Sequence, residues 1–186
     1  MSKKIIVSVI ITTKNEENNI RNCLDSIRKQ DYNKKKSEII VVDNNSSDKT
    51  KEIASNYTNK VFDKGPERSA QRNFGAENAK GKYILYLDAD MILSENVVSE
   101  CVTNAEKDGF IGLYIPEIIV GSGFWIKVRN FERSFYNTTC IDAVRFILRK
   151  KFWEIGGFDL SMTGPEDWDL DRRLNEKGKL GIIASI

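Results

Sequence analysis

The chain has 186 residues, of which 40% are hydrophobic and 30% are charged, and its formal net charge is +2. A chain of this size can bury one sizeable core, and its nearly neutral charge gives no electrostatic sign of a nucleic-acid partner. Histidine is absent, which excludes Ser-His-Asp and Cys-His catalytic pairs and histidine zinc sites. Proton transfer must therefore rest on a carboxylate, a lysine, a tyrosine or water.

The three cysteines, Cys23, Cys101 and Cys140, are odd in number and lack C-x-x-C spacing. This pattern argues against a disulfide framework or a zinc site and favours a reducing, cytoplasmic environment, including the cytoplasmic face of a membrane. No apolar run reaches the roughly 20 residues that a membrane-spanning helix needs. The β-branched run at residues 5–13 therefore predicts a first strand.

The first 60 residues follow a strand, loop, helix, strand, loop, helix order. After the first strand, apolar residues recur at the i, i+3, i+4, i+7 spacing of one helix face: Ile20, Cys23, Leu24 and Ile27. A second strand at residues 38–43 ends in polar residues that favour a helix start, and the next helix runs to about Tyr57. This order predicts a mostly parallel α/β sheet with helices on both faces.

Residues 61–62 predict a short third strand, and residues 69–79 a helix with Ala70 and Phe74 facing inward and Gly81 as its C-terminal cap. The central strand follows at residues 83–87, where large apolar side chains form a run typical of a strand buried on both faces.

Two carboxylates, Asp88 and Asp90, follow directly at the carboxyl end of this strand. Their i, i+2 spacing places both side chains on the same side of an extended backbone, where open α/β sheets bind ligands. Paired carboxylates there suit a hard cation such as Mg²⁺ or Mn²⁺, which in turn suits a phosphorylated ligand. The alternative is that both acids only form a turn before the helix near Ser94.

The second half of the chain predicts further helices and strands around a flexible point at residues 121–123. Val97 begins an amphipathic helix, and residues 110–120 read as a strand. An aromatic helix stripe follows, which we expect to lie in the core: Phe124, Val128, Phe131 and Phe135. Residues 143–148 predict a strand, residues 166–177 a helix ended by Gly178, and residues 180–186 a final strand.

Four segments in this order resemble the family 2 glycosyltransferases of the GT-A fold. They are SVIITTKNE at residues 8–16, IVVDNNSSDKT at 40–50, DAD at 88–90, and GPEDWDL at 164–170 with Arg173. The resemblance covers essentially the whole chain. It implies an inverting, metal-dependent transfer of a sugar from a UDP- or GDP-linked donor to the hydroxyl of a glycan or lipid-linked acceptor.

The resemblance also assigns residues to the donor site. It implies nucleoside binding by Thr12, Lys14, Glu16 and Asp43, although Asp43 can instead have a helix-capping role shared with Ser46 and Ser47. Arg68, Gln71, Arg72 and Asn73 resemble the family's segment near the sugar diphosphate, and plain surface exposure is the alternative for all four. Arg173 completes the expected donor-binding set.

For the chemistry, the resemblance implies that Asp90 binds Mn²⁺ or Mg²⁺ and that Asp88 contacts the ribose or a metal-bound water. Asp167 is expected to be the general base, with Glu166 as its neighbour in the same motif, in an apolar setting that Trp153 and Trp168 would provide. The alternative for Glu166 and Asp167 is structural, because acids at a helix N-terminus are stabilised by the helix dipole.

We expect one domain over residues 1–186, with a nucleotide-binding half at about 1–92 and an acceptor-side half at about 93–186. Compared with the family the chain is short at its C-terminus, so a donor-binding module without independent activity is the alternative function. The segments 124–126 and 150–153 are candidates for peripheral membrane association, although core packing is the better explanation for both. A dinucleotide-binding dehydrogenase is disfavoured, because no G-x-G-x-x-G follows the first strand.

Overall fold

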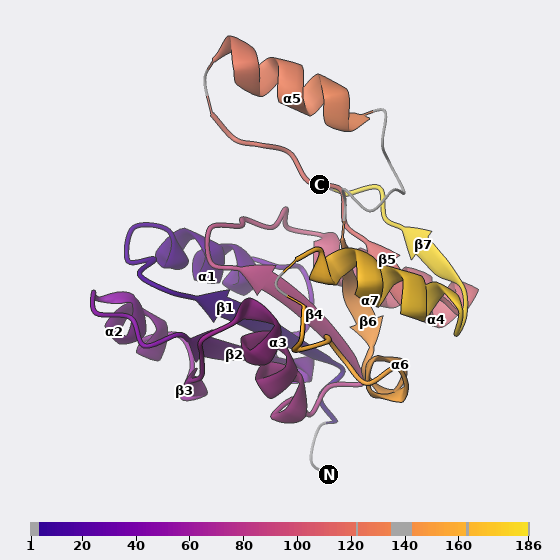
Figure 1. The fold of residues 1–186 in the computed structure, drawn as a ribbon, viewed down its shortest axis with the longest axis horizontal. Coiled ribbons are helices and arrows are strands. Elements are labelled where there is room, and N and C mark those ends of the chain that lie inside the picture. The colour runs from indigo at the N-terminus through magenta and orange to yellow at the C-terminus, as the bar shows by residue number, and fades with distance from the viewer. Residues whose placement is uncertain (1–3, 122, 135–142, 163, 186) are drawn as a thin grey trace.

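The computed structural model describes residues 4–121, 123–134, 143–162 and 164–185. It contains a seven-stranded sheet with the strand order β3-β2-β1-β4-β6-β5-β7 (Figure 1). The strands are β1 (Val7–Thr13), β2 (Ser37–Asp43), β3 (Val61–Asp63), β4 (Tyr83–Asp88), β5 (Gly112–Tyr114), β6 (Val144–Leu148) and β7 (Leu180–Ile182). The pairs among β3, β2, β1 and β4 are parallel, whereas β6 is antiparallel to both β4 and β5. The predicted mostly parallel α/β sheet is confirmed.

Helices cover both faces of this sheet, as expected from strands that are apolar on both sides. They are α1 (Ile20–Arg28), α2 (Thr50–Ser55), α3 (Arg68–Glu77), α4 (Val97–Asp108), α5 (Phe124–Ser134), α6 (Arg149–Glu154) and α7 (Glu166–Asn175), with a short 3₁₀ helix at Lys34–Lys36. Buried side chains of α1, α2 and α4 form one core, and those of α3, α6 and α7 form the other. Alternate residues of β1 divide between the two cores, since Ile11 belongs to the first and Ile10 to the second.

Helix α3 lies unusually close to the sheet. A Cβ atom added at Gly75 would lie 2.3 Å from a methyl carbon of Ile10, so only glycine allows this approach. The residues buried along α3 are Ser69, Gln71, Arg72, Gly75 and Ala76. The prediction that Ala70 and Phe74 face inward holds only in part: both are half-buried, and Phe74 packs against the second core.

Gly81 is not the cap of α3 that the sequence predicts. The helix ends at Glu77 with Asn78 as its C-cap, and Gly81 instead lies against β1. Its N–H donates to the hydroxyl of Ser8 at 2.9 Å, and an added Cβ would lie 2.7 Å from the backbone nitrogen of Ser8. Close backbone contact with β1 therefore explains this glycine.

The strand expected over residues 110–120 is much shorter in the structure. Only Gly112–Tyr114 pairs with neighbouring strands, as β5, and residues 115–120 lack regular structure. Similarly, β7 covers only residues 180–182 of the strand expected at 180–186.

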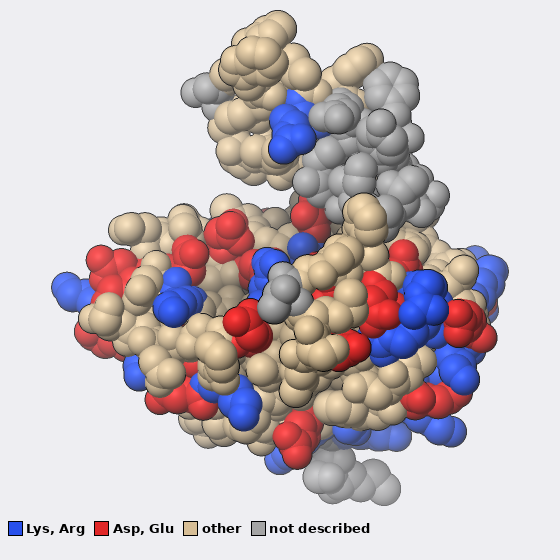
Figure 2. All heavy atoms as spheres, viewed as in Figure 1, with Lys and Arg blue, Asp and Glu red and all other residues tan. Residues whose placement is uncertain are grey.

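The aromatic stripe expected in the core is exposed. Helix α5 projects from the body of the molecule (Figure 1), and Figure 2 shows it as a mostly tan protrusion. Phe124 is 72% exposed, Trp125 76% and Phe131 68%, which contradicts core packing because no sheet face lies under these side chains in the described part of the chain. Phe135, Ser122 of the expected flexible point, and Cys140 lie outside the described residues. None of the described helices has the length and apolar character needed to cross a bilayer.

Candidate active site

A pocket of about 260 Å³ opens where β1 and β4 end, at the sheet edge that the sequence analysis favours for a ligand. Its lining residues come from the β1 end and following loop, from α3, and from the β4 end: Thr12, Thr13, Lys14, Glu16, Arg68, Gln71, Asp88, Ala89 and Asp90. Larger depressions elsewhere on the surface lack this set of acids and hydroxyls. The parallel strands thus bring together segments that are far apart in sequence.

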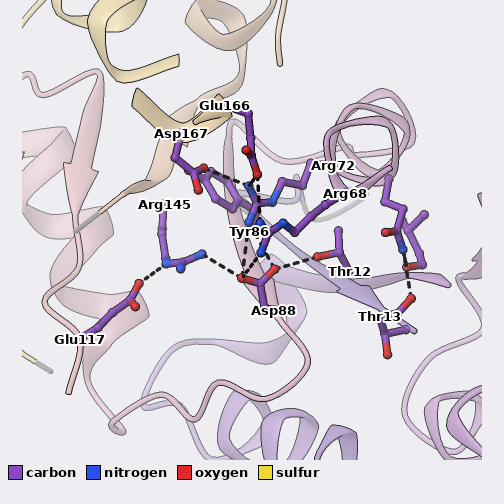
Figure 3. Close-up of polar contacts among 12 residues, drawn as sticks. Thr12, Thr13, Arg68, Arg72, Tyr86, Asp88, Glu117, Arg145, Glu166 and Asp167 are labelled. Atoms are coloured by element: carbon purple, nitrogen blue, oxygen red, sulfur yellow. Dashed lines mark hydrogen bonds and ion pairs between the residues drawn. The ribbon is translucent and has the colours of Figure 1, made fainter. Parts of the chain in front are cut away.

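Asp88 is the most heavily contacted acid of the site (Figure 3). The hydroxyl of Thr12 donates to its Oδ1 at 3.0 Å, and Arg72 Nη2 lies 3.3 Å from the same oxygen. Its Oδ2 lies 3.8 Å from Arg68 and 3.9 Å from Arg145. Burial raises the pKa of Asp88, but the guanidiniums of Arg72, Arg145 and Arg68 outweigh burial and hold that pKa below its usual value. Asp88 is therefore an anion at neutral pH.

Arg72 joins the two acidic parts of the site. Its side chain is 1% exposed and it contacts Asp167 Oδ1 at 2.9 Å as well as Asp88. Its guanidinium lies over the ring of Tyr86 at 4.6 Å and over that of Phe158 at 5.1 Å, which favours a fixed orientation. One buried cation thus connects the end of β4 with the N-terminus of α7 (Figure 3).

The contacts of Asp167 fall on one of its two oxygens. Arg72 and the hydroxyl of Tyr86, at 3.4 Å, both donate to Oδ1. Oδ2 has no hydrogen bond to a residue in the part of the chain that the structure describes, and the side chain is 26% exposed. Oδ2 is therefore not held by a hydrogen bond to the described residues, and the side chain that carries it is partly exposed. Glu166 beside it is paired with Arg68 at 3.2 Å.

Among the described residues, Trp153 and Trp168 do not provide the apolar setting expected for Asp167. Trp168 is 52% exposed and Trp153 is 39% exposed, so neither indole encloses the carboxylate. Because side chains on successive residues of a helix point in different directions, adjacency in sequence does not bring Trp168 over its neighbour. The immediate partner of Asp167 is a cation rather than an aromatic ring.

Asp90 has the exposed carboxylate of the pair. It lines the pocket but makes no hydrogen bond or ion pair with another described residue, whereas Asp88 is held by guanidiniums. No group of three or more Cys, Asp or Glu side chains among the described residues is arranged to hold a metal ion. Mg²⁺ commonly uses only one or two carboxylates and completes its shell with substrate phosphates and water, so this arrangement is compatible with a cation that binds together with a phosphorylated ligand.

The charge of the site also fits a cation. Five carboxylates and three guanidiniums make up the group: Asp88, Asp90, Glu117, Glu166, Asp167, Arg68, Arg72 and Arg145. Negative charge therefore exceeds positive charge by two, and the additional pocket residues Lys14 and Glu16 cancel. A divalent cation would neutralise this excess before an anionic ligand entered.

Two expected donor-site residues have structural partners. Asp43 is fully buried, and its two carboxylate oxygens accept hydrogen bonds from the backbone N–H and the hydroxyl of Ser46. The expected partner Ser46 is confirmed, but Asp43 does not cap α2, whose N-cap is Lys49. The side-chain amide of Gln71 donates to the carbonyls of Thr13 and Val42, which ties α3 to β1 and β2. Gln71 lines the pocket, whereas Asp43 is not among the lining residues.

Asn73 and Arg173 are not brought to the pocket. Asn73 bonds both backbone groups of Phe158 through its side-chain amide. Arg173 pairs with Asp169 and donates to the carbonyls of Ile155 and Gly157. Both therefore stabilise the turn between α6 and α7, and through it the position of the acids on α7.

Three residues of the site were not predicted from the sequence: Arg145, Glu117 and Tyr86. Arg145 lies on β6 and is 7% exposed, and its Nε donates to Glu117. The arginine inside the apolar run of residues 143–148 could have indicated a buried ion pair, because a charged side chain is rarely buried without a partner of opposite charge. Glu117 gave no such signal, since residues 115–120 looked like part of a strand.

The sequence matches known proteins over most of its length. A family model described as "Glycosyl transferase family 2" matches residues 8–162. The glycosyltransferase AglE of Haloferax volcanii is 41% identical over 91 residues, which are 45% of this chain and 30% of AglE. The poly(ribitol-phosphate) beta-N-acetylglucosaminyltransferase TarS of Staphylococcus aureus is 33% identical over 141 residues, covering 71% of this chain and 23% of TarS. The chain thus spans less than a third of the length of these relatives.

Solved structures share the fold. The crystal structure of residues 1–349 of S. aureus TarS in complex with UDP-GlcNAc has a TM-score of 0.79 at 21% identity, covering 97% of this chain and 56% of that one. The mannosyltransferase PcManGT from Pyrobaculum calidifontis, in complex with GDP-Man and Mn²⁺, has a TM-score of 0.74 at 22% identity, covering 99% and 56%. Fold, motif order and the family match agree, and the chain belongs to glycosyl transferase family 2.

Proposed function

We propose that this chain is the catalytic domain of an inverting, divalent-metal-dependent glycosyltransferase that moves a sugar from a nucleoside-diphosphate sugar to an acceptor hydroxyl. The observation that carries the proposal is the Arg72 bridge, which holds Asp88 at the pocket and Asp167 on α7 against one guanidinium. A sugar bound in the pocket would then lie beside a carboxylate oxygen able to accept a proton. UDP and GDP donors are favoured, because TarS was solved with UDP-GlcNAc and PcManGT with GDP-Man.

The donor would bind at the edge formed by Thr12, Lys14 and Asp90. Arg68 is suited to the diphosphate, since its side chain is 55% exposed and its contacts with Asp88 and Glu166 are long enough to be exchanged. Arg72 is buried and would stay fixed between the two acids. Asp90 would hold the Mn²⁺ or Mg²⁺ ion, which when bound supplies Lewis-acid stabilisation of the leaving diphosphate.

Asp167 is proposed as the general base. Its Oδ2 would take the proton of the acceptor hydroxyl while the hydroxyl oxygen forms a bond to the anomeric carbon. The bond from that carbon to the diphosphate oxygen breaks on the opposite face, and its electron pair leaves with the nucleoside diphosphate. One displacement of this kind inverts the anomeric configuration. Arg72 and Tyr86 would orient the carboxylate through Oδ1.

Nucleotide-dependent stabilisation tests the donor half of the proposal. Thermal unfolding would be followed with UDP or GDP, with and without Mn²⁺, on the wild type and on Asp90→Ala. A ligand at about 100 times its Kd adds about 2.7 kcal/mol to the free energy of unfolding. We expect one nucleotide to stabilise the wild type only with Mn²⁺ and to lose this effect in Asp90→Ala; stabilisation by neither nucleotide would contradict the proposal.

Product formation separates an enzyme from a donor-binding module. Asp167→Asn should abolish transfer or donor hydrolysis while the nucleotide-induced shift stays close to that of the wild type. Loss of activity with Glu166→Gln but not with Asp167→Asn would move the base to Glu166. A wild-type chain that binds nucleotide and forms no product would favour the binding module.

The exposed face of α5 supports a proposal for the acceptor side. Phe124, Trp125 and Phe131 stand out from the body beside Lys127 and Arg129, a combination typical of helices that lie on anionic membranes. We therefore propose peripheral association with the cytoplasmic face of a membrane and a lipid-linked or other glycan acceptor. Co-sedimentation with anionic and neutral vesicles tests this, because Trp125→Ser should lose binding only if the helix contacts lipid.

A further inference from the structure

Arg145 is a buried cation that the proposed chemistry does not use. Its side chain is 8% exposed, and its guanidinium lies 5.6 Å from the centre of the Tyr86 ring. Nε donates to Glu117, whereas Nη1 is buried without a hydrogen bond and lies 3.9 Å from Asp88 Oδ2. Because an unsatisfied buried donor is costly, this geometry points to a role that outweighs that cost.

The topology explains how a residue of β6 reaches the pocket. β6 is antiparallel to β4, with Phe146 opposite Leu85 and Leu148 opposite Tyr83. The beginning of β6 therefore lies at the same sheet edge as the end of β4. Arg145 shares with Tyr86 and Asp88 the sheet face that α3 and α7 cover, so its guanidinium approaches Asp88 from the side opposite α3 (Figure 3).

Three arginines surround one oxygen of Asp88. Arg72 lies 3.5 Å, Arg68 3.8 Å and Arg145 3.9 Å from Oδ2. Arg72 and Thr12 also contact Oδ1. Arg68 is exposed and can turn toward a phosphate, but Arg145 is held in place by Glu117. When Arg68 leaves, Oδ2 keeps Arg72 at 3.5 Å on the α3 side, and Arg145 supplies the cation on the other side.

We propose that Arg145 is a positioning residue for donor binding. It keeps the Asp88 carboxylate in place when Arg68 turns to the donor diphosphate, and through Glu117 it ties residues 115–120, which lead into α5, to the pocket. This inference rests on the proposed glycosyltransferase function. It assigns Arg145 to the binding of the donor and not to proton transfer at Asp167, with which no contact of Arg145 is found among the described residues.

Steady-state kinetics of three arginine variants test the inference. Arg145→Met removes the cation and keeps a long side chain, and Arg145→Lys keeps a cation. Arg149→Met is the control, since Arg149 is a half-buried arginine four residues along whose Nε donates to the Gly81 carbonyl, outside the pocket. We expect Arg145→Met to raise the donor KM about 10-fold or more with little change in kcat, because the variant loses both the charged hydrogen bond to Glu117 and the ion pair with Asp88. Arg145→Lys should recover much of the loss, and Arg149→Met should match the wild type.

An unchanged donor KM in folded Arg145→Met, or a fall in kcat alone, would overturn the inference. If the wild type neither binds nucleotide nor forms product, the proposed function fails. Amide hydrogen exchange then tests separately whether Arg145 links residues 115–120 to the pocket. Arg145→Met, but not Arg149→Met, should speed exchange at residues 115–120 and 88–91 in the ligand-free protein. Equal exchange rates in the wild type, Arg145→Met and Arg149→Met would refute this link.

Discussion

Arg72 and Arg68 form a matched pair for testing how burial changes the contribution of an ion pair to the free energy of unfolding. Both lie on α3, one turn apart, and both contact Asp88 and Glu166. Their side chains differ in exposure, 1% for Arg72 against 55% for Arg68. The same substitution to methionine keeps the length of each side chain and removes its charge.

The expected losses of stability differ several-fold. Removing one partner of a buried pair costs about 3–5 kcal/mol, and the lower end applies here because Asp88 and Asp167 are 23% and 26% exposed. Arg72→Met should therefore lower the free energy of unfolding by about 3 kcal/mol, which for a chain of this size lowers Tm by about 6–12 °C. Arg68→Met should cost about 0–1 kcal/mol, as exposed pairs do, and lower Tm by less than about 4 °C.

Urea unfolding followed by circular dichroism measures both variants under identical conditions. The transition slope should stay constant, so that the midpoint reports stability alone. Equal losses in the two variants would refute the reasoning, since they would show that burial does not decide the strength of these contacts. A stable Arg72→Met protein would also remove the argument that Arg72 organises the site.

Two further predictions concern the scaffold. Burial raises the pKa of Glu38, but hydrogen bonds from Lys60 and Ser8 outweigh it and hold the pKa below its usual value. The stability difference between the wild type and Glu38→Gln should therefore be present above pH about 4.3 and disappear as the pH falls through the lowered pKa, in urea titrations at several pH values. Gly75→Ala should destabilise the protein by about 1–3 kcal/mol in the same assay, despite alanine's higher helix propensity, because the new methyl group would collide with Ile10. Wild-type stability in Gly75→Ala would show that α3 can move away from β1.

The sequence alone determined the class of fold and the edge of the sheet at which to look. Continuous apolar runs located β1, β2 and β4, because a strand that is buried on both faces carries apolar side chains at successive positions. The acids that end β4 and begin α7 were visible for the same reason, since each follows a recognisable element or turn. Rules based on residue spacing use only neighbouring residues, and these strands and acids depend only on neighbouring residues.

The tertiary structure decided which of the candidate side chains meet. Arg72 connects Asp88 with Asp167 because α3 and α7 cover the same sheet face, a fact that no local spacing contains. Asn73 and Arg173 were equally plausible in sequence, but the fold directs them to the turn between α6 and α7.

The same distinction explains the errors at α5 and β6. An aromatic helix stripe predicts an apolar face, but whether a sheet lies under that face depends on how the chain continues, and for α5 the face is exposed. Arg145 reaches Asp88 only because β6 runs antiparallel to β4, and strand direction is set by packing of distant segments. The sequence was therefore enough to predict the strands and the acids that follow them. The ion-pair partners of those acids, and which side chains are buried, depend on the packed tertiary structure.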